Sequence, residues 1–323
     1  VAFASCSFTS KSFDNPDKDK HLMQLVTYLL EEGHYEPKNI NDSFSEGVYE
    51  RFLNQVDPFK NYFYQSDIKE FEAYKTDLDD QILNHSVAFF NLVYNRLITR
   101  IEDSRSLYAQ VLETPFNYDL EESFDTDYEN KSYSSSKSQM KDNWRKQLKF
   151  STLSNYHDLV TDKKETKRSN SDLEAEARGM TLKSLNESAS YMDDLRREDW
   201  LSIYINSIAE EFDPHTFYFA PQDKDRFDAQ MSGKYEGIGA RLQKRMDEIS
   251  ITELISGGSA WRQNKLEVGD VILKVRQEDE LEAVNVVGMR LDDAVKLIKG
   301  PKGTNVILTL KKVDGTIEDL TIP

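Results

Sequence analysis

The residues best suited to chemistry form a glycine-rich turn, Gly-Ile-Gly-Ala at positions 237–240. Its glycines, Gly237 and Gly239, allow consecutive backbone N–H groups to converge on one point, and such a cluster of donors binds anions. A strand of alternating pattern begins directly at Ala240. Alone, a Gly-x-Gly turn is a weak signal, because hairpin turns contain it and the third glycine of a dinucleotide-binding fingerprint is absent. The turn therefore indicates an anion site only together with the elements that position it.

The segments that follow the turn supply those elements. Runs of Val, Ile and Leu between glycine-containing turns predict short strands, and an apolar stripe at helical spacing predicts a helix. The predicted elements are a strand at 249–255, a short helix opening at 256–260, a turn into a strand at 266–275, an amphipathic helix at 291–300 and a closing strand at 306–310.

This order of elements resembles a PDZ domain. Residues 237–240 are similar to the carboxylate-binding loop of that family, and residues 266–270 are similar to its Gly-Asp turn. The resemblance implies that the N–H groups of Ile238, Gly239 and Ala240 hold the terminal carboxylate of a peptide through charge-assisted hydrogen bonds. An ordinary hairpin turn is the competing interpretation of the two glycines.

The strand after the turn and the amphipathic helix are expected to form the two sides of a peptide-binding groove. The strand, with Leu242, offers its edge for β-augmentation. Leu291 and Val295 are four residues apart on the helix, and we expect them to face the groove and select apolar side chains. Ala294 and Ile298 are expected to face the core.

A wider set of motifs resembles the tail-specific, or C-terminal processing, serine peptidases of bacteria. The region 18–71 is similar to the N-terminal helical domain of that family, whereas 100–200 matches only loosely. Ser259 and Met289 depart from the family, which commonly has proline and tryptophan there, and both changes could alter the shape or mobility of the groove. The motifs that carry the resemblance are Asp213-Pro214-His215-Thr216 with Tyr218-Phe219, Phe227 with Gln230-Met231-Ser232, residues 236–240, residues 286–293 and residues 299–304.

No catalytic residue can be assigned in this chain. In the family resembled, the nucleophilic serine and its lysine base lie downstream of the PDZ domain, and the sequence ends at Pro323. Ser134 and Lys137 match a Ser-x-x-Lys pattern, but we expect them in an exposed polar loop where no burial lowers the pKa of the lysine. The fragment is therefore expected to bind and present a substrate without cutting it.

The distribution of charge and glycine predicts two domains of different class. Residues 221–323 hold 16 basic and 18 acidic side chains, whereas the whole chain of 323 residues holds 41 and 58. Ten of the 13 glycines lie at or after Gly233. We predict an α+β multidomain protein, with a remnant of a signal or a flexible terminus at 1–17, an all-α domain of seven or eight helices at 18–220 and a mainly β PDZ domain at 221–323. Within the helical domain, residues 66–112 predict one long helical stretch.

Composition excludes several classes of function. A net charge of −17 leaves no basic stripe to neutralise phosphates, so a nucleic-acid partner is not expected. A single cysteine excludes a disulfide framework, and no two of the five histidines stand at metal-ligand spacing. No metal and no cofactor are expected.

The first six residues form an apolar stub that ends at Cys6. Ala2-Phe3-Ala4 has the small-x-small form of a secretory cleavage site. Phe3-Ala4-Ser5-Cys6 resembles the end of a bacterial lipoprotein signal, in which the cysteine is lipidated. We expect a periplasmic or exported protein, with membrane attachment only through a lipid on Cys6. A frayed terminus with an inert thiol is the alternative.

The chain also contains an internal echo at an offset of 156 residues. Asp57-Pro58 and Asp213-Pro214 are each followed by an aromatic pair and by an aspartate that can cap the next helix, Asp67 or Asp223. An old duplication and a common way of building a helical corner explain the echo equally well. We interpret both copies, and His215 beside the second, as structural.

Three functional hypotheses remain. The first is the substrate-recognition part of an exported C-terminal processing serine endopeptidase, whose partners are proteins or peptides with free C-termini, with an adaptor protein as a further candidate partner. The second is a non-enzymatic PDZ adaptor or scaffold. The third, and weakest, is binding of acidic ligands through Lys296, Lys299 and Lys302, which fit a solvated helix face and turn better.

Overall fold

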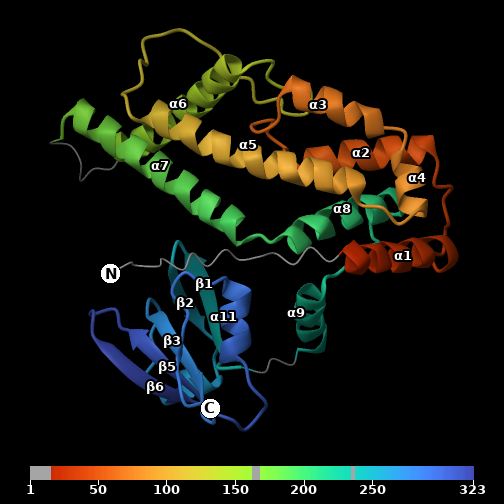
Figure 1. The fold of residues 1–323 in the computed structure, drawn as a ribbon. Helices are drawn as coiled ribbons and strands as arrows, with labels where there is room; N and C mark the ends of the chain where they lie inside the picture. Colours follow the sequence, from red (N-terminus) through yellow and green to blue (C-terminus); the bar gives the residue numbers. More distant parts are fainter. Residues whose placement is uncertain (1–15, 162–167, 234–236) are drawn as a thin grey trace, which may run out of the picture. The chain divides into compact units, whose positions relative to one another are not determined.

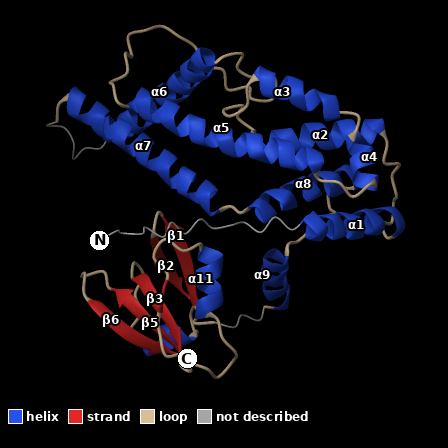
Figure 2. Ribbon diagram, in the orientation of Figure 1, coloured by secondary structure: helices blue, strands red, loops and turns tan. Residues whose placement is uncertain are grey.

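The computed structural model describes residues 16–161, 168–233 and 237–323. The chain divides into two compact units, one made of the residues up to Lys183 with Arg196–Tyr218 and the other of Ser184–Leu195 with Phe219–Pro323. The first unit is helical and the second is built around an antiparallel sheet (Figures 1 and 2). The predicted fold class, helical and then mainly β, is confirmed. Among the described residues, none of the helices has the length and apolar content to cross a membrane. Cys6 lies outside the described residues.

The sheet of the second unit has the strand order β1-β2-β3-β5-β6, with β4 paired to β3, and all pairs are antiparallel. Among the described residues, three complete helices belong to the same unit, together with the helical segment that ends at Asp194. The strands are β1 (Ala240–Arg245), β2 (Glu248–Leu254), β3 (Val271–Gln277), β4 (Val284–Asn285), β5 (Val306–Lys311) and β6 (Ile317–Ile322), and the helices are α9 (Pro221–Ser232), α10 (Ser259–Gln263) and α11 (Leu291–Ile298).

Most of these elements match the segments predicted from the sequence, and β6 was missed. The prediction placed the closing strand at 306–310, which is β5. Asp314-Gly315 then turns the chain into β6, where Leu320 and Ile322 point into the core at alternate positions. A turn dipeptide followed by alternation is the signal for a hairpin, so this strand could have been predicted.

The helical unit contains eight α-helices and one 3₁₀ turn among its described residues, the last part of α7 being assigned to the other unit. Figure 1 shows them in chain order. They are α1 (Pro16–Glu32), α2 (Asp42–Val56), α3 (Gln65–Phe71), the 3₁₀ turn Glu72–Tyr74, α4 (Leu78–Leu83), α5 (Ala88–Leu112), α6 (Lys137–Thr161), α7 (Asn170–Asp194) and α8 (Arg197–Phe212).

Aromatic side chains fill the centre of this unit, where α2, α5 and α8 meet. Phe52 of α2, Phe90 of α5 and Tyr204 of α8 are almost fully buried. The ring centroid of Tyr204 lies 5.0 Å from that of Phe52, edge to face, and 5.8 Å from that of Phe90, stacked. Each large ring removes much apolar surface from water, so this cluster is a main source of stability for the unit.

The long helical stretch predicted for residues 66–112 is helical over most of its length, but it is not one continuous helix. The structure divides it into α3, a 3₁₀ turn, α4 and α5, with His85 at a φ of 57° between α4 and α5. Phe71, Ile82 and Phe89 lie in three different pieces and are all fully buried. The apolar spacing is helical throughout, but one straight helix could not direct all three side chains to the same core.

The two copies of the internal echo share their turn but differ in burial. Asp57 accepts hydrogen bonds from the backbone N–H groups of Asn61, Tyr62 and Phe63 at 2.8, 3.1 and 2.9 Å. Burial raises the pKa of Asp57 to about 6, against the effect of these three bonds. Asp213 accepts from the backbone N–H of His215 at 3.2 Å and remains partly exposed. Both aspartates therefore organise a corner, as interpreted from the sequence.

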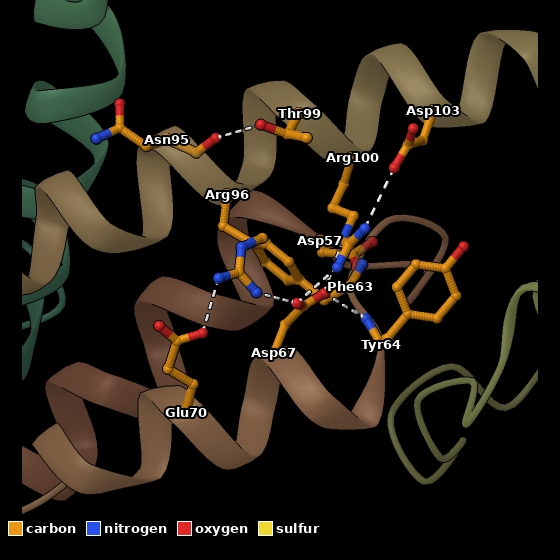
Figure 3. A network of polar contacts seen from close by, with 10 residues as sticks. All are labelled: Asp57, Phe63, Tyr64, Asp67, Glu70, Asn95, Arg96, Thr99, Arg100 and Asp103. Atoms are coloured by element: carbon orange, nitrogen blue, oxygen red, sulfur yellow. Dashed lines mark hydrogen bonds and ion pairs between the residues drawn. The ribbon is translucent and has the colours of Figure 1, made fainter.

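Asp67 connects α3 to α5 through a buried ion-pair network (Figure 3). Its Oδ2 accepts the backbone N–H of Tyr64 at 2.9 Å, which completes the predicted helix cap. Arg100 of α5 donates to both carboxylate oxygens, from Nε at 2.9 Å and from Nη2 at 2.8 Å, and Arg96 also binds Oδ1. Burial alone would raise the pKa of Asp67, but these bonds hold it below its usual value.

Replacing Asp67 with asparagine is expected to lower the free energy of unfolding by about 2–3 kcal/mol, because two arginines lose their shared carboxylate. The loss stays below that of a fully buried pair, since the side chains of Arg96 and Arg100 are 28% and 21% exposed. Because the folded-state pKa is lowered, this contribution is complete above the ordinary value of 3.8 and disappears only as the pH falls through the lowered value.

Urea unfolding followed by circular dichroism measures this loss. Glu50→Gln is the control, because Glu50 pairs with Lys75 on the surface and should contribute less than about 0.5 kcal/mol. Equal losses in the two variants would contradict the role assigned to Asp67.

Candidate functional site

The glycine turn at 237–240 presents its backbone donors away from the rest of its unit. The C=O of Ile238 accepts the N–H of Ala260 at 2.9 Å, and the C=O of Gly239 accepts the N–H of Ile255 at 2.9 Å. In a trans peptide the N–H points opposite to the C=O. The N–H groups of Gly239 and Ala240 are therefore directed away from α10 and β2. Within the described part of the chain, no hydrogen bond uses the N–H of Ile238 or of Gly239.

Strand β1 continues this row of outward-facing polar groups. Among the described strands, β1 pairs only with β2 and so lies at the edge of the sheet. A two-residue connection joins β1 to β2, so Arg245 and Glu248 form the hydrogen-bonded pair next to the turn. By alternation, the N–H and C=O groups of Leu242 and Lys244 point away from β2. The register shift between Arg241 and Leu242 places its extra residue, Thr252, on β2, so the alternation along β1 continues and the N–H of Ala240 lies on the same open side.

The apolar residues predicted for the site lie on neighbouring elements. Leu242 of β1 and Leu291 of α11 are half-buried and pack against the core of the unit, and Val295 is half-buried one turn along α11. α11 contacts β1 (Figure 1). Ala294 and Ile298, which adjoin them on the same apolar stripe of α11, are buried, as predicted. The half-buried positions leave apolar surface exposed beside β1.

A close backbone contact explains why glycine occupies position 239. Gly239 has a φ of +77°, which side-chain-bearing residues rarely adopt. A Cβ atom there would lie 2.8 Å from the Cα of Gly258, the residue that caps α10. Sequence reasoning assigned Gly239 to the turn but missed Gly258 as its packing partner. Two glycines nineteen residues apart carry no local signal of contact.

The two departures from the family pattern have simple local settings. Ser259 is the first residue of α10, a helix position at which proline is favoured because its N–H is not needed there. Met289 is partly buried against the core of the unit.

The Ser-x-x-Lys match at 134–137 is not a catalytic pair in this structure. Ser134 is fully buried, so the expectation of an exposed loop at this residue is wrong. Its hydroxyl accepts a hydrogen bond from Asn143 Nδ2 at 3.0 Å, and its C=O accepts the N–H of Gln65 at 2.9 Å. Lys137 is exposed at the start of α6. Among the residues with described positions, no three acidic, histidine or cysteine side chains gather as a metal-ligand set.

Comparison with known families divides the chain in the same order. The model described as "Tail specific protease N-terminal domain" matches residues 26–222, and the PDZ domain model matches residues 227–311. The PDZ resemblance noted in the sequence is thereby confirmed. The match to the helical-domain model extends well past residue 71. It includes the region 100–200, in which the motifs of the sequence matched the family only loosely.

Individual relatives carry related names. The "Tail-specific protease" of Haemophilus influenzae is 30% identical over 291 residues, which cover 90% of this chain and 40% of the relative. "Carboxy-terminal processing protease CtpA" of Bacillus subtilis is 34% identical over 116 residues, 34% of this chain and 23% of the relative. The chain thus spans less than half the length of these relatives.

A solved structure also matches the second unit. It is a PDZ domain of a carboxy-terminal protease from Vibrio cholerae in complex with a peptide. It is 47% identical, covers 27% of this chain and 90% of that chain, and has a TM-score of 0.26.

Replacing Gly239 with alanine is expected to destabilise the second unit by about 2–4 kcal/mol, because backbone strain adds to a clash with Gly258. Gly315→Ala is the matched control: Gly315 also has a positive φ, +88°, but a Cβ atom there would meet nothing within 4 Å. The control should lose only about 1 kcal/mol. Amide hydrogen exchange of β2 and β3 measures both effects, and similar losses would contradict the close-contact argument.

Proposed function

The chain belongs to the tail-specific protease family, and we propose that it is the part of such an enzyme that recognises substrates by their free C-termini. The PDZ unit binds the last residues of a protein and presents the chain to a serine and lysine catalytic core elsewhere in the longer enzyme. The protein works outside the cytoplasm, as its cleavage-like residues 2–4 suggest.

The observation that carries this proposal is the direction of the donors in the glycine turn. The C=O groups of Ile238 and Gly239 are used inside the unit, so the N–H groups that follow them in the chain face outward. A carboxylate is the ligand that suits them, because hydrogen bonds to an ionised acceptor are about twice as strong as neutral ones. In this proposal, Gly237 and Gly239 shape the turn, and Ile238, Gly239 and Ala240 donate.

The edge of β1 holds the residues that precede the terminus. A peptide running antiparallel to β1 pairs with the outward groups of Ala240, Leu242 and Lys244, at every second residue. Its terminal side chain lies near Ile238, Leu242, Leu291 and Val295, all apolar. The site therefore prefers an apolar last residue and reads the rest of the peptide mainly through its backbone.

A peptide with a free C-terminus is expected to bind this chain about 10- to 100-fold more tightly than its amidated copy. The amide removes the charge that strengthens hydrogen bonds to the turn, and such bonds contribute about 1.5–3 kcal/mol. Fluorescence anisotropy with a labelled apolar-ended peptide measures both dissociation constants. Equal affinity for the two forms would exclude carboxylate capture.

Affinity should rise with peptide length up to about five residues and then level off. Outward positions on β1 end at Lys244, so residues beyond the fifth find no further backbone partner on this strand. Each added pair of hydrogen bonds is expected to improve affinity about two- to tenfold. Peptides of two, three, five and seven residues with a common ending provide the series. A steady gain from five to seven residues would contradict pairing along β1.

A further inference from the structure

A lysine whose ammonium group has no ion-pair partner among the described residues lies beside the glycine turn. The side chain of Lys299, just after α11, passes Gly237: a Cβ atom built on Gly237 would lie 3.9 Å from the Cγ of Lys299. Lys299 is exposed, and among the described residues no carboxylate pairs with its ammonium group. Two methylenes separate Cγ from the ammonium, so the charge can reach over the turn.

The backbone of Lys299 is held firmly although its side chain is exposed. Its N–H donates to the C=O of Val295 at 2.9 Å. Gln277 of β3 donates from Nε2 to the C=O groups of Leu297 at 2.6 Å and of Lys299 at 3.3 Å. These bonds satisfy carbonyls at the end of α11 and tie the helix end to the sheet. The root of the lysine side chain is therefore fixed next to the turn, whereas its tip forms no ion pair with the described residues.

We propose that Lys299 is a second carboxylate-binding group of this site, which pairs its ammonium with the terminal carboxylate held by the backbone donors. The inference rests on the function proposed above and adds a specific cation to it. The ligand class is a peptide ending in a free carboxylate. The backbone N–H groups fix the position of the carboxylate, and the lysine supplies the full positive charge that these dipoles lack.

This assignment distinguishes Lys299 from the other lysines near it. Lys296, on α11, has its Nζ 3.8 Å from the Oδ1 of Asp293, three residues earlier on the same helix. Lys302 is exposed in the turn that follows. Sequence reasoning grouped all three as a solvated face. Only the packing of the Lys299 stem beside Gly237 separates one of them from the rest.

A charge at the rim of a binding site acts mainly on association and on salt dependence. Lys299→Gln is therefore expected to weaken binding of a five-residue free-acid peptide about three- to tenfold at low salt, chiefly through a slower association rate. The difference should shrink at high salt, where exposed charges are screened. Binding of the amidated peptide should not change.

Lys296→Gln is the matched control, since it removes the same charge from the same helix and changes the net charge equally. Its effect on free-acid binding should stay within about twofold. Stopped-flow association of a labelled peptide at 50 mM and 500 mM salt, about 14 and 4 Å of screening length, provides the readout for wild type and both variants. Unfolding midpoints check that each variant is folded. We expect both variants to fold because both side chains are exposed.

The outcomes separate this inference from the proposed function. A preference for the free acid that Lys299→Gln reduces and Lys296→Gln does not would support the inference. A preference that is as large in Lys299→Gln as in wild type, or that falls equally in both variants, would overturn the role of Lys299 and leave carboxylate capture in place. A wild type without any preference for the free acid would overturn both.

Discussion

The site depends on the planarity of two peptide bonds. The carbonyls of Ile238 and Gly239 are each bound within the unit, one by α10 and one by the residue after β2. Because a trans peptide directs N–H and C=O to opposite sides, satisfying these acceptors forces the next two donors outward. Two ordinary internal hydrogen bonds thus orient the donors to which the proposed function assigns a carboxylate, and no charged side chain is needed to orient them.

These two hydrogen bonds require the turn to approach α10 closely. The approach is possible because both residues at the contact, Gly239 and Gly258, are glycines. Gly239 and Gly258 meet backbone to backbone, so the turn packs directly against the start of α10. β1 then extends the same open row of polar groups, and α11 lies beside it with Leu291 and Val295 half-buried. The recognition elements are therefore positioned by the sheet and its core, which suits a site that must be rigid before its ligand arrives.

Local sequence patterns predicted the structural features that are set by residues close together in the chain. The apolar stripe of α11 followed from spacing alone, and Ala294 and Ile298 are buried as expected. Asp67 was predicted as a helix cap. Its partners Arg96 and Arg100 lie 29 and 33 positions later in the chain, so no local sequence pattern indicated these ion pairs. The division of the stretch 66–112 and the burial of Ser134 were missed for the same reason: both are set by packing between distant segments. In the site, the contact of Gly239 with Gly258 likewise left no trace in the sequence.

The donors of the turn belong to the main chain, and this has a consequence for how such a site can evolve. A substitution at most positions changes a side chain and leaves every amide in place, so drift can reshape the apolar surroundings at Leu242, Leu291 and Val295 without touching the anion-binding groups. Under the proposed function, selectivity for the final side chain can therefore change while the requirement for a chain end is kept. Only a change in backbone path, and so in practice the loss of a glycine, would abolish it.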